Sequence, residues 1–363
     1  MRLIALPALL LLALLRPALA QPTPAEAAYR EIFSVTALGT PAPSVAAAAS
    51  FGLAYRGMMP HAAFALARDA GGRSAWGYVG GAPSPEAAAS AALARCTRSL
   101  GGLQAECRLL ARDAGLVGGP AVPLAEGGIG PFRWAPMLLR RGPQQARGVL
   151  VWSHGYGGPE RDHRHGATPP FVSLLNDNGW DVLRFDRHPG DDSLYASLPR
   201  LTAGLPALRE AGYRRILLGG QSRGGWQSIM AASERPELVE AVIATAPAAH
   251  GEASRPNNLG AALDDFRRLL AGLPEARPRL AVVLFDGDDY DPDPERRAAL
   301  AEARAKERVA PSLVLWPGND VRGHAGGAEL RFTLAYAGCL LGLVQAPEAA
   351  APRGLRRAPC GGG

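Results

Sequence analysis

The sequence predicts an α/β protein, with a main domain built on a mostly parallel sheet with helices on both faces and a small α+β domain before it. From Phe132 onward, short apolar runs typical of buried strands alternate with helical patterns. Upstream, two strand-like runs, one helix and a third strand-like run follow each other without such alternation. Glycine and proline are frequent in residues 117–131, which we interpret as the linker between the domains. A chain of 363 residues can bury a core in each domain.

The N-terminus has the pattern of a signal peptide over residues 1–20. Arg2 precedes an apolar run over residues 3–15, and Ala18-Leu19-Ala20 forms an A-x-A cleavage site before Gln21. That run is too short to span a bilayer, and no other stretch reaches about 18 uninterrupted apolar residues. We therefore expect a periplasmic or secreted protein, cleaved near Ala20, with no membrane span in the mature chain.

The first part of the mature chain is expected to be an alanine- and proline-rich linker over residues 21–50. The small domain then occupies residues 51–116. Its strands are predicted at 64–68, 74–79 and 107–111, with a helix to Arg98 that begins after the capping residue Ser84. This β-β-α-β order resembles small secreted domains of unknown function, and the resemblance implies neither a chemistry nor a particular protein partner.

Four cysteines, which lie in two pairs along the chain, are expected to form disulfides, because an oxidising compartment allows thiols to pair. Four cysteines permit three pairings, and we expect the local one, Cys96 with Cys107 and Cys339 with Cys360. In the domains that the N-terminal part resembles, a cysteine late in the helix pairs with one on the next strand. Neither pair has the spacing or the nearby histidines of a metal site.

The main domain is placed at residues 132–346, with a C-terminal tail over residues 347–363. Its strands are predicted at 148–153, 182–185, 215–218, 241–245, 280–285 and 313–316. After the third of these runs comes Gly220-Gln221-Ser222-Arg223-Gly224, which fits the G-x-S-x-G turn between a strand and a helix. Such a turn exposes the serine hydroxyl, although a glycine-rich chain also produces the pattern by chance.

Two later loops supply an acid and a histidine. Run 280–285 is followed by a cluster of carboxylates, and run 313–316 is followed by a loop that holds His324. The chain order is therefore serine, acid, histidine, each after a strand, where open α/β sheets place their sites. An earlier strand leads into a histidine-glycine segment of the kind that supplies an oxyanion hole; its residues are Trp152-Ser153-His154-Gly155-Tyr156-Gly157-Gly158.

These four pieces resemble the α/β-hydrolase superfamily, especially its lidless bacterial members such as dienelactone hydrolases and esterases. The resemblance implies Ser222 as nucleophile, His324 as general base and the N–H groups of Tyr156 and Arg223 as the oxyanion hole. In the family the acid usually stands where this sequence has Tyr290. We therefore favour the neighbouring Asp291, with Asp289 and then Asp288 as alternatives.

The function predicted is an exported serine hydrolase that cleaves an ester, lactone or thioester of a small molecule through an acyl-serine, without a cofactor or metal. A peptidase or amidase of the same fold, or an inactive binding protein, are the alternatives. Although the net charge is +6, its basic residues are almost all arginine and form no run interleaved with aromatics, which argues against nucleic-acid binding. Arg223 could contact an anionic substrate group or pair with a nearby carboxylate, and His188 and His250 could line the site.

Overall fold

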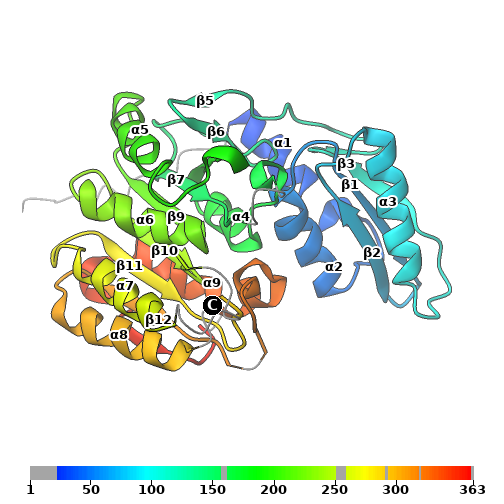
Figure 1. Cartoon of the computed structure of the whole chain (residues 1–363). Coiled ribbons are helices and arrows are strands. Elements are labelled where there is room, and N and C mark those ends of the chain that lie inside the picture. The colour runs from blue at the N-terminus through cyan, green and yellow to red at the C-terminus, as the bar shows by residue number, and fades with distance from the viewer. Residues whose placement is uncertain (1–22, 157–161, 251–258, 291–292, 319, 361–363) are drawn as a thin grey trace, which may run out of the picture.

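The computed structural model describes residues 23–360, apart from 157–161, 251–258, 291–292 and 319. The predicted signal peptide therefore lies outside the described residues. Two sheets are present, one of four strands and one of nine, and each has its own helices (Figure 1). This arrangement confirms the predicted fold class. Within the described ranges, every helix is too short or too polar to cross a bilayer.

The small domain is an antiparallel sheet in the order β2-β1-β3-β4. Its strands are β1 (Ala63–Arg68), β2 (Ser74–Val79), β3 (Arg108–Arg112) and β4 (Gly115–Leu116). Helix α3 (Pro85–Arg98) starts after Ser84, whose hydroxyl accepts a hydrogen bond from the Ala87 N–H. The buried alanines of α3 pack on alanines of β1, so helix and sheet lie close together.

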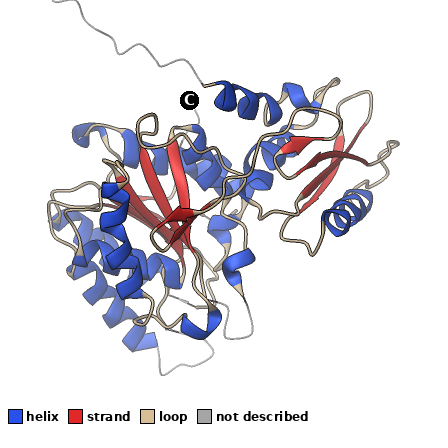
Figure 2. Ribbon diagram, turned by 90° about the horizontal axis from the view of Figure 1, so that it is seen from above, coloured by secondary structure: helices blue, strands red, loops and turns tan. Residues whose placement is uncertain are grey.

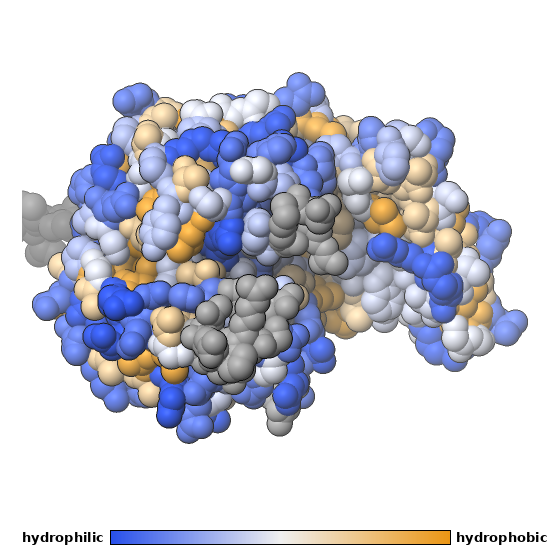
Figure 3. Space-filling model, in the orientation of Figure 1, coloured by the Kyte–Doolittle hydropathy of each residue, from blue (hydrophilic) through white to orange (hydrophobic). Residues whose placement is uncertain are grey.

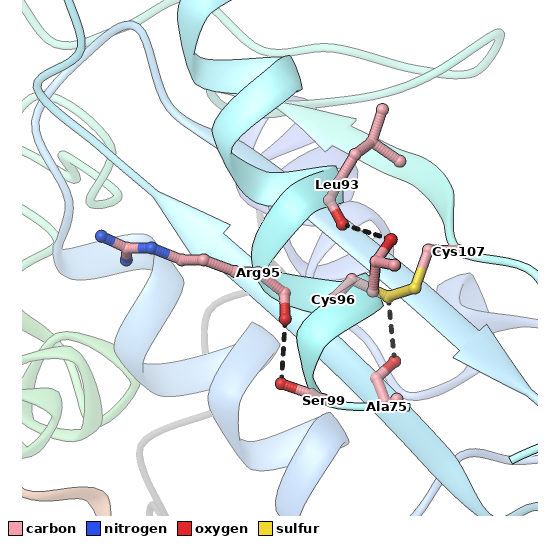
Figure 4. Close-up of a disulfide and its surroundings, with 7 residues drawn as sticks. Ala75, Leu93, Arg95, Cys96, Ser99 and Cys107 are labelled. Carbon is pink, nitrogen blue, oxygen red and sulfur yellow. Dashed lines mark hydrogen bonds between the residues drawn. A yellow bond between two sulfur atoms is a disulfide. The ribbon is translucent and has the colours of Figure 1, made fainter. Parts of the chain in front are cut away.

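A disulfide joins Cys96, near the end of α3, to Cys107, just before β3, with their Cα atoms 6.0 Å apart (Figure 4). The Cys96 Sγ also lies 3.5 Å from the Ala75 carbonyl of β2. The bond therefore connects the end of the helix to the sheet on which it packs, in the pairing that we expected.

The segment expected to be a linker is instead folded onto the other face of the small sheet. It holds α1 (Pro24–Ile32) and α2 (Val45–Ala49). Tyr29 and Ile32 of α1 are buried, and Phe51 just after α2 meets Phe64 of β1 edge to face with ring centroids 5.0 Å apart. A few large apolar side chains at helical spacing were enough to anchor this segment, although alanine and proline dominate its composition.

The main sheet has the order β13-β12-β11-β10-β9-β7-β8-β6-β5. Strands β7 (Gly148–Ser153), β8 (Trp180–Phe185), β9 (Ile216–Gln221), β10 (Ala241–Thr245), β11 (Arg279–Val283) and β12 (Ser312–Leu315) are parallel. At one edge, β6 (Phe132–Trp134) and β5 (Gly128–Ile129) are antiparallel. Because β7 lies between β8 and β9, the strand order reverses there, which is where open α/β sheets form their binding crevices.

Helices cover both faces of this sheet (Figure 2). On one face lie α4 (Pro170–Asp177) and α9 (Leu330–Gln345); on the other lie α5 (Leu198–Glu210), α6 (Arg223–Glu234), α7 (Leu259–Ala271) and α8 (Pro294–Glu307). Alternate residues of a strand serve the two cores: in β7, Val149 and Val151 face one core while Leu150 and Trp152 face the other. The predicted strands of this domain differ from the observed ones only at their ends.

The C-terminal segment, which we expected to be a tail, adds a strand to the sheet. β13 (Gly354–Arg356) pairs in parallel with β12 at the edge. A disulfide between Cys339 of α9 and Cys360 then ties the segment to the helix, with Cα atoms 5.5 Å apart. This is the second pairing that we expected.

The two domains are joined by an ion pair whose arginine is buried. Arg56, which is 3% exposed, forms two hydrogen bonds of 2.6 Å to the carboxylate of Asp177 at the end of α4. Its guanidinium also lies over the rings of Tyr29 and Phe33. Next to it, the Gly57 carbonyl accepts a hydrogen bond of 2.9 Å from the N–H of Thr168, which leads into α4. The small domain thus contacts the segment between β7 and α4.

Candidate active site

Ser222 stands at a sharp turn between β9 and α6. Its φ of 56° is a backbone conformation that residues other than glycine rarely adopt. The turn is held from both sides, because the Ser222 N–H donates to the Thr245 carbonyl of β10 and the Ser222 carbonyl accepts from the Trp226 N–H of α6, each at 3.0 Å. Surrounding packing therefore maintains a strained serine at the carboxyl end of a central strand.

The glycines around Ser222 allow the strand and helix to cross closely. A Cβ on Gly220 would lie 2.3 Å from the carbonyl carbon of Gly224, and a Cβ on Gly224 would lie 2.2 Å from the Ser153 carbonyl oxygen of β7. Both distances are impossible for real carbon atoms. The G-x-S-x-G pattern is thus required by the packing at this turn.

His324 and Asp288 form a hydrogen-bonded pair in the loops after β12 and β11. The distance from His324 Nδ1 to Asp288 Oδ1 is 2.8 Å, and the Asp288 side chain is only 3% exposed. Tyr290 lies against the imidazole, with the two ring centroids 4.3 Å apart. A carboxylate in this position accepts a hydrogen bond from the Nδ1–H group, so that the Nε2 atom carries the lone pair and can act as a base.

Asp286 holds the two loops together. Its carbonyl accepts a hydrogen bond of 2.8 Å from the Gly323 N–H, and its carboxylate accepts one of 2.9 Å from the Trp316 indole. Both partners come from the segment that carries His324. Asp286 is therefore a structural residue that brings the acid and the histidine together.

Of the three aspartates considered from the sequence, the structure describes Asp288 and Asp289, and Asp288 is the one of these two that contacts His324. Asp289 is exposed, and the favoured Asp291 lies outside the described residues. Asp288 points inward because the turn after it is tight: its Oδ1 also accepts a hydrogen bond of 2.9 Å from the Tyr290 N–H, and the preceding Gly287 has a φ of 67°. The spacing expected from the family did not anticipate this short turn.

His324 lies beside the serine turn. Its backbone carbonyl accepts a hydrogen bond of 3.1 Å from the Gln221 side chain, next to Ser222. Within the described part of the chain, the imidazole bonds to Asp288 and not to Ser222. Catalytic hydrogen bonds are often long without a substrate and tighten when it binds, so the arrangement is compatible with a base for Ser222.

The segment after β7 lies directly against the serine. A Cβ on Gly155 would lie 3.2 Å from the Ser222 Cβ, which places the following residue, Tyr156, beside the nucleophile. Arg223 is the first residue of α6, so its N–H has no acceptor within the helix. The two residues expected to form the oxyanion hole thus both lie near Ser222, and the Arg223 guanidinium stacks on the Tyr156 ring, 3.7 Å from its centroid.

His154 stabilises the segment after β7 through hydrogen bonds of its ring. Its Nε2 accepts a hydrogen bond of 2.9 Å from the Arg187 N–H, so Nδ1 carries the proton and donates to the Gly155 carbonyl at 2.7 Å. Burial, with a further contribution from the charge of Arg187, lowers the pKa of His154 to about 3. The imidazole is therefore neutral and structural.

An apolar groove of about 530 Å³ runs between α6 and α7. Its lining includes Tyr195, Trp226, Met230 and Leu269, and Figure 3 shows apolar side chains gathered in this region. His250 is part of its wall and its Nε2 lies 2.7 Å from the Asp265 carboxylate. The lining of this groove includes none of Ser222, Asp288 and His324.

The remaining histidines have structural contacts or are exposed. His188 is exposed, and its Nδ1 accepts a hydrogen bond from the Gly190 N–H. Asp162, which lies beside His163 and His165, pairs with Arg164 at 2.6 Å. No cluster of three metal-ligating side chains occurs in the portion of the chain that the structure describes.

The strand order, the helices on both faces and the serine turn at the end of β9 define the α/β-hydrolase fold. No family model and no curated protein matches the chain. Among solved structures it is similar to Est1E from Butyrivibrio proteoclasticus (18% identity over 54% of this chain and 86% of that chain, TM-score 0.39). It is also similar to a dienelactone hydrolase from Anabaena variabilis (18% identity, 48% and 76%, TM-score 0.34). Dipeptidyl peptidase 4 of Porphyromonas gingivalis is a third (16% identity, TM-score 0.37), with 50% of this chain matching only 29% of that chain.

Proposed function

We propose that the protein is an exported serine hydrolase that cleaves a carboxylic ester of a small molecule through an acyl-serine intermediate. The observation that carries the proposal is the buried pair of Asp288 and His324 beside the strained turn of Ser222. A serine, a carboxylate and a histidine, in this chain order, are the elements of a nucleophile activated by a base.

In the reaction, the Ser222 hydroxyl oxygen attacks the carbonyl carbon of the ester and transfers its proton to His324 Nε2. Asp288 stabilises the imidazolium that results. The negative charge on the former carbonyl oxygen is stabilised by the N–H groups of Tyr156 and Arg223. The bond to the alcohol then breaks, and the alcohol leaves with the proton from His324. A water molecule, deprotonated by the same imidazole, hydrolyses the acyl-serine.

Export is supported by two disulfides, since such bonds are rare in reducing compartments. The signal peptide stays a prediction, and its cleavage can be checked by the mass of the secreted product.

The first test is labelling with a fluorophosphonate, followed by peptide mapping and by kinetics on short acyl esters. We expect one adduct, on Ser222, and loss of both labelling and hydrolysis in Ser222→Ala. Faster cleavage of aminoacyl anilides than of esters would favour a peptidase. A folded protein that is neither labelled nor active would be a binding protein of the same fold.

The acid is tested with three matched variants, Asp288→Asn, Asp289→Asn and Asp291→Asn. We expect kcat to fall about 10³- to 10⁴-fold in the first, because the amide no longer stabilises the imidazolium, and to be unchanged in the other two. A large loss in Asp291→Asn with normal activity in Asp288→Asn would reverse the assignment.

A further inference from the structure

Asp192 is a buried carboxylate that the proposed reaction does not use. It lies between β8 and α5, and its side chain is 3% exposed. Two arginines reach it from different elements: Arg187, two residues after β8, and Arg223, the first residue of α6. Each of these arginines also contacts one residue of the segment that carries the proposed oxyanion hole.

The first connection runs through Arg187 to His154. Arg187 Nε lies 2.6 Å from Asp192 Oδ1, and its Nη2 donates to the His154 carbonyl. The Arg187 backbone N–H donates to the His154 ring as well. The guanidinium is fully buried and its Nη1 has no hydrogen-bond partner among the described residues. Its orientation and its charge therefore depend on Asp192.

The second connection runs through Arg223 to Tyr156. The Arg223 guanidinium lies over the Tyr156 ring, 3.7 Å from its centroid. Its Nη1 donates to the Asp192 carbonyl and lies 3.9 Å from Asp192 Oδ1. The stacked arginine thus holds Tyr156 against α6, and Asp192 holds the arginine.

We propose that Asp192 is a positioning residue for the oxyanion hole: it fixes Arg187 on His154 and Arg223 on Tyr156, and through them the N–H groups beside Ser222. The inference rests on the proposed function. Asp192 can orient the N–H groups of Tyr156 and Arg223 because Arg187 hydrogen-bonds to the His154 carbonyl, two residues before Tyr156, and Arg223 stacks on the Tyr156 ring. Asp192 touches neither substrate nor Ser222 in this scheme.

The expected effect follows from the geometry that an oxyanion hole needs. Loss of one donor typically costs about 10²- to 10³-fold in kcat, and a displacement of about 1 Å can cost about 10²-fold. Asp192→Asn keeps the size of the side chain and the backbone carbonyl that accepts from Arg223, but removes the negative charge that lies 2.6 Å from Arg187 Nε and 3.9 Å from Arg223 Nη1. We expect kcat on a short acyl ester to fall about 10- to 100-fold with KM nearly unchanged. The rate of phosphonate labelling should fall in parallel, because the phosphoryl oxygen occupies the same site.

The matched control is Asp186→Asn. Asp186 is also a largely buried carboxylate, 10% exposed, and it pairs with the buried Arg184 at 3.0 Å. That arginine donates to the carbonyls of Arg164 and Gly166 and contacts neither His154 nor Tyr156. Asp186→Asn should lose comparable stability yet keep the kcat of the wild type.

A second variant, Arg223→Met, tests the same idea without removing a buried charge partner from Arg187. It keeps the backbone N–H but abolishes the stacking on Tyr156, so kcat should fall while the protein stays folded. Adding Asp192→Asn to Arg223→Met should cost less than Asp192→Asn alone, because the two share one route.

The inference would be wrong if Asp192→Asn had the kcat and KM of Asp186→Asn, or if Arg223→Met were as active as the wild type. Should Asp192→Asn fail to fold, the result for Arg223→Met decides. Failure of the proposed function is seen separately, because the wild-type protein would then neither react with the phosphonate nor cleave esters.

Discussion

Acidification should destabilise the folded protein through His154. The ring has no capacity for a second proton in the fold, because Nε2 accepts from the Arg187 N–H while Nδ1 donates to the Gly155 carbonyl. Burial and the charge of Arg187 lower its pKa from 6.5 to about 3. In the unfolded chain the same imidazole takes up a proton near its ordinary pKa.

The direction of the effect follows from proton binding in the two states. Between pH 6.5 and about 3 the unfolded state binds the proton and the folded state does not, so stability falls as the pH falls through this range. Each pH unit contributes about 1.4 kcal/mol, so the free energy of unfolding should drop by roughly 3 kcal/mol between about pH 6.5 and about pH 4.5.

The measurement is urea unfolding at several pH values for the wild type and for His154→Gln, which retains an acceptor for the Arg187 N–H but cannot be protonated. Carboxylates titrate equally in both proteins, so the difference between their pH dependences isolates His154. We expect the variant to lack roughly 3 kcal/mol of the acid-induced loss. His165→Gln, whose side chain is 69% exposed, is the control and should behave as the wild type. Parallel pH curves for wild type and His154→Gln would refute the reasoning.

Two further predictions concern the domain contact and the serine turn. Asp177→Ala leaves the buried Arg56 guanidinium without its counter-ion and should lower the free energy of unfolding, measured by heat or urea, by about 3–5 kcal/mol. Arg56→Met should cost less, because the Asp177 carboxylate that remains is 44% exposed and can be hydrated. Equal losses in the two variants would contradict this asymmetry. Gly224→Ala should abolish activity and lower stability, because its Cβ would overlap the Ser153 carbonyl. The control is Gly260→Ala in α7, where a Cβ meets no atom within 4 Å, and it should be neutral or slightly stabilising. Melting temperatures and ester kinetics of the two variants check this.

The main domain was predictable because its signals are local. Buried parallel strands need continuous apolar runs, and α/β units repeat them at regular intervals, so strands such as Gly148–Ser153 and Ala241–Thr245 were found at their observed bounds. The turn at Ser222 could also be predicted from the sequence, since the strand and the helix cross so closely that only glycine fits at positions 220 and 224. Both disulfides followed from short separations along the chain.

Segments of biased composition were harder to interpret. Residues 24–32 were expected to belong to a linker, but burial of Tyr29 and Ile32 makes them a packed helix. The C-terminal segment likewise adds β13 to the sheet edge, because β12 offers an open edge there and Cys360 is tied to α9. In both cases the segment is stabilised by contacts with residues distant in sequence, so its composition could not predict that it folds.

Local sequence specified the α/β architecture, the strained serine turn and the order of serine, acid and histidine, because each depends on neighbouring residues along the chain. The contact between Asp288 and His324 required the folded protein, since the two residues lie in separate loops, after β11 and β12, which Asp286 also joins. The same holds for Asp192, whose two arginines follow β8 and β9 and meet only because β7 brings these two strands together in the sheet. Contacts between residues so far apart in the chain are determined by packing geometry, which no local pattern encodes.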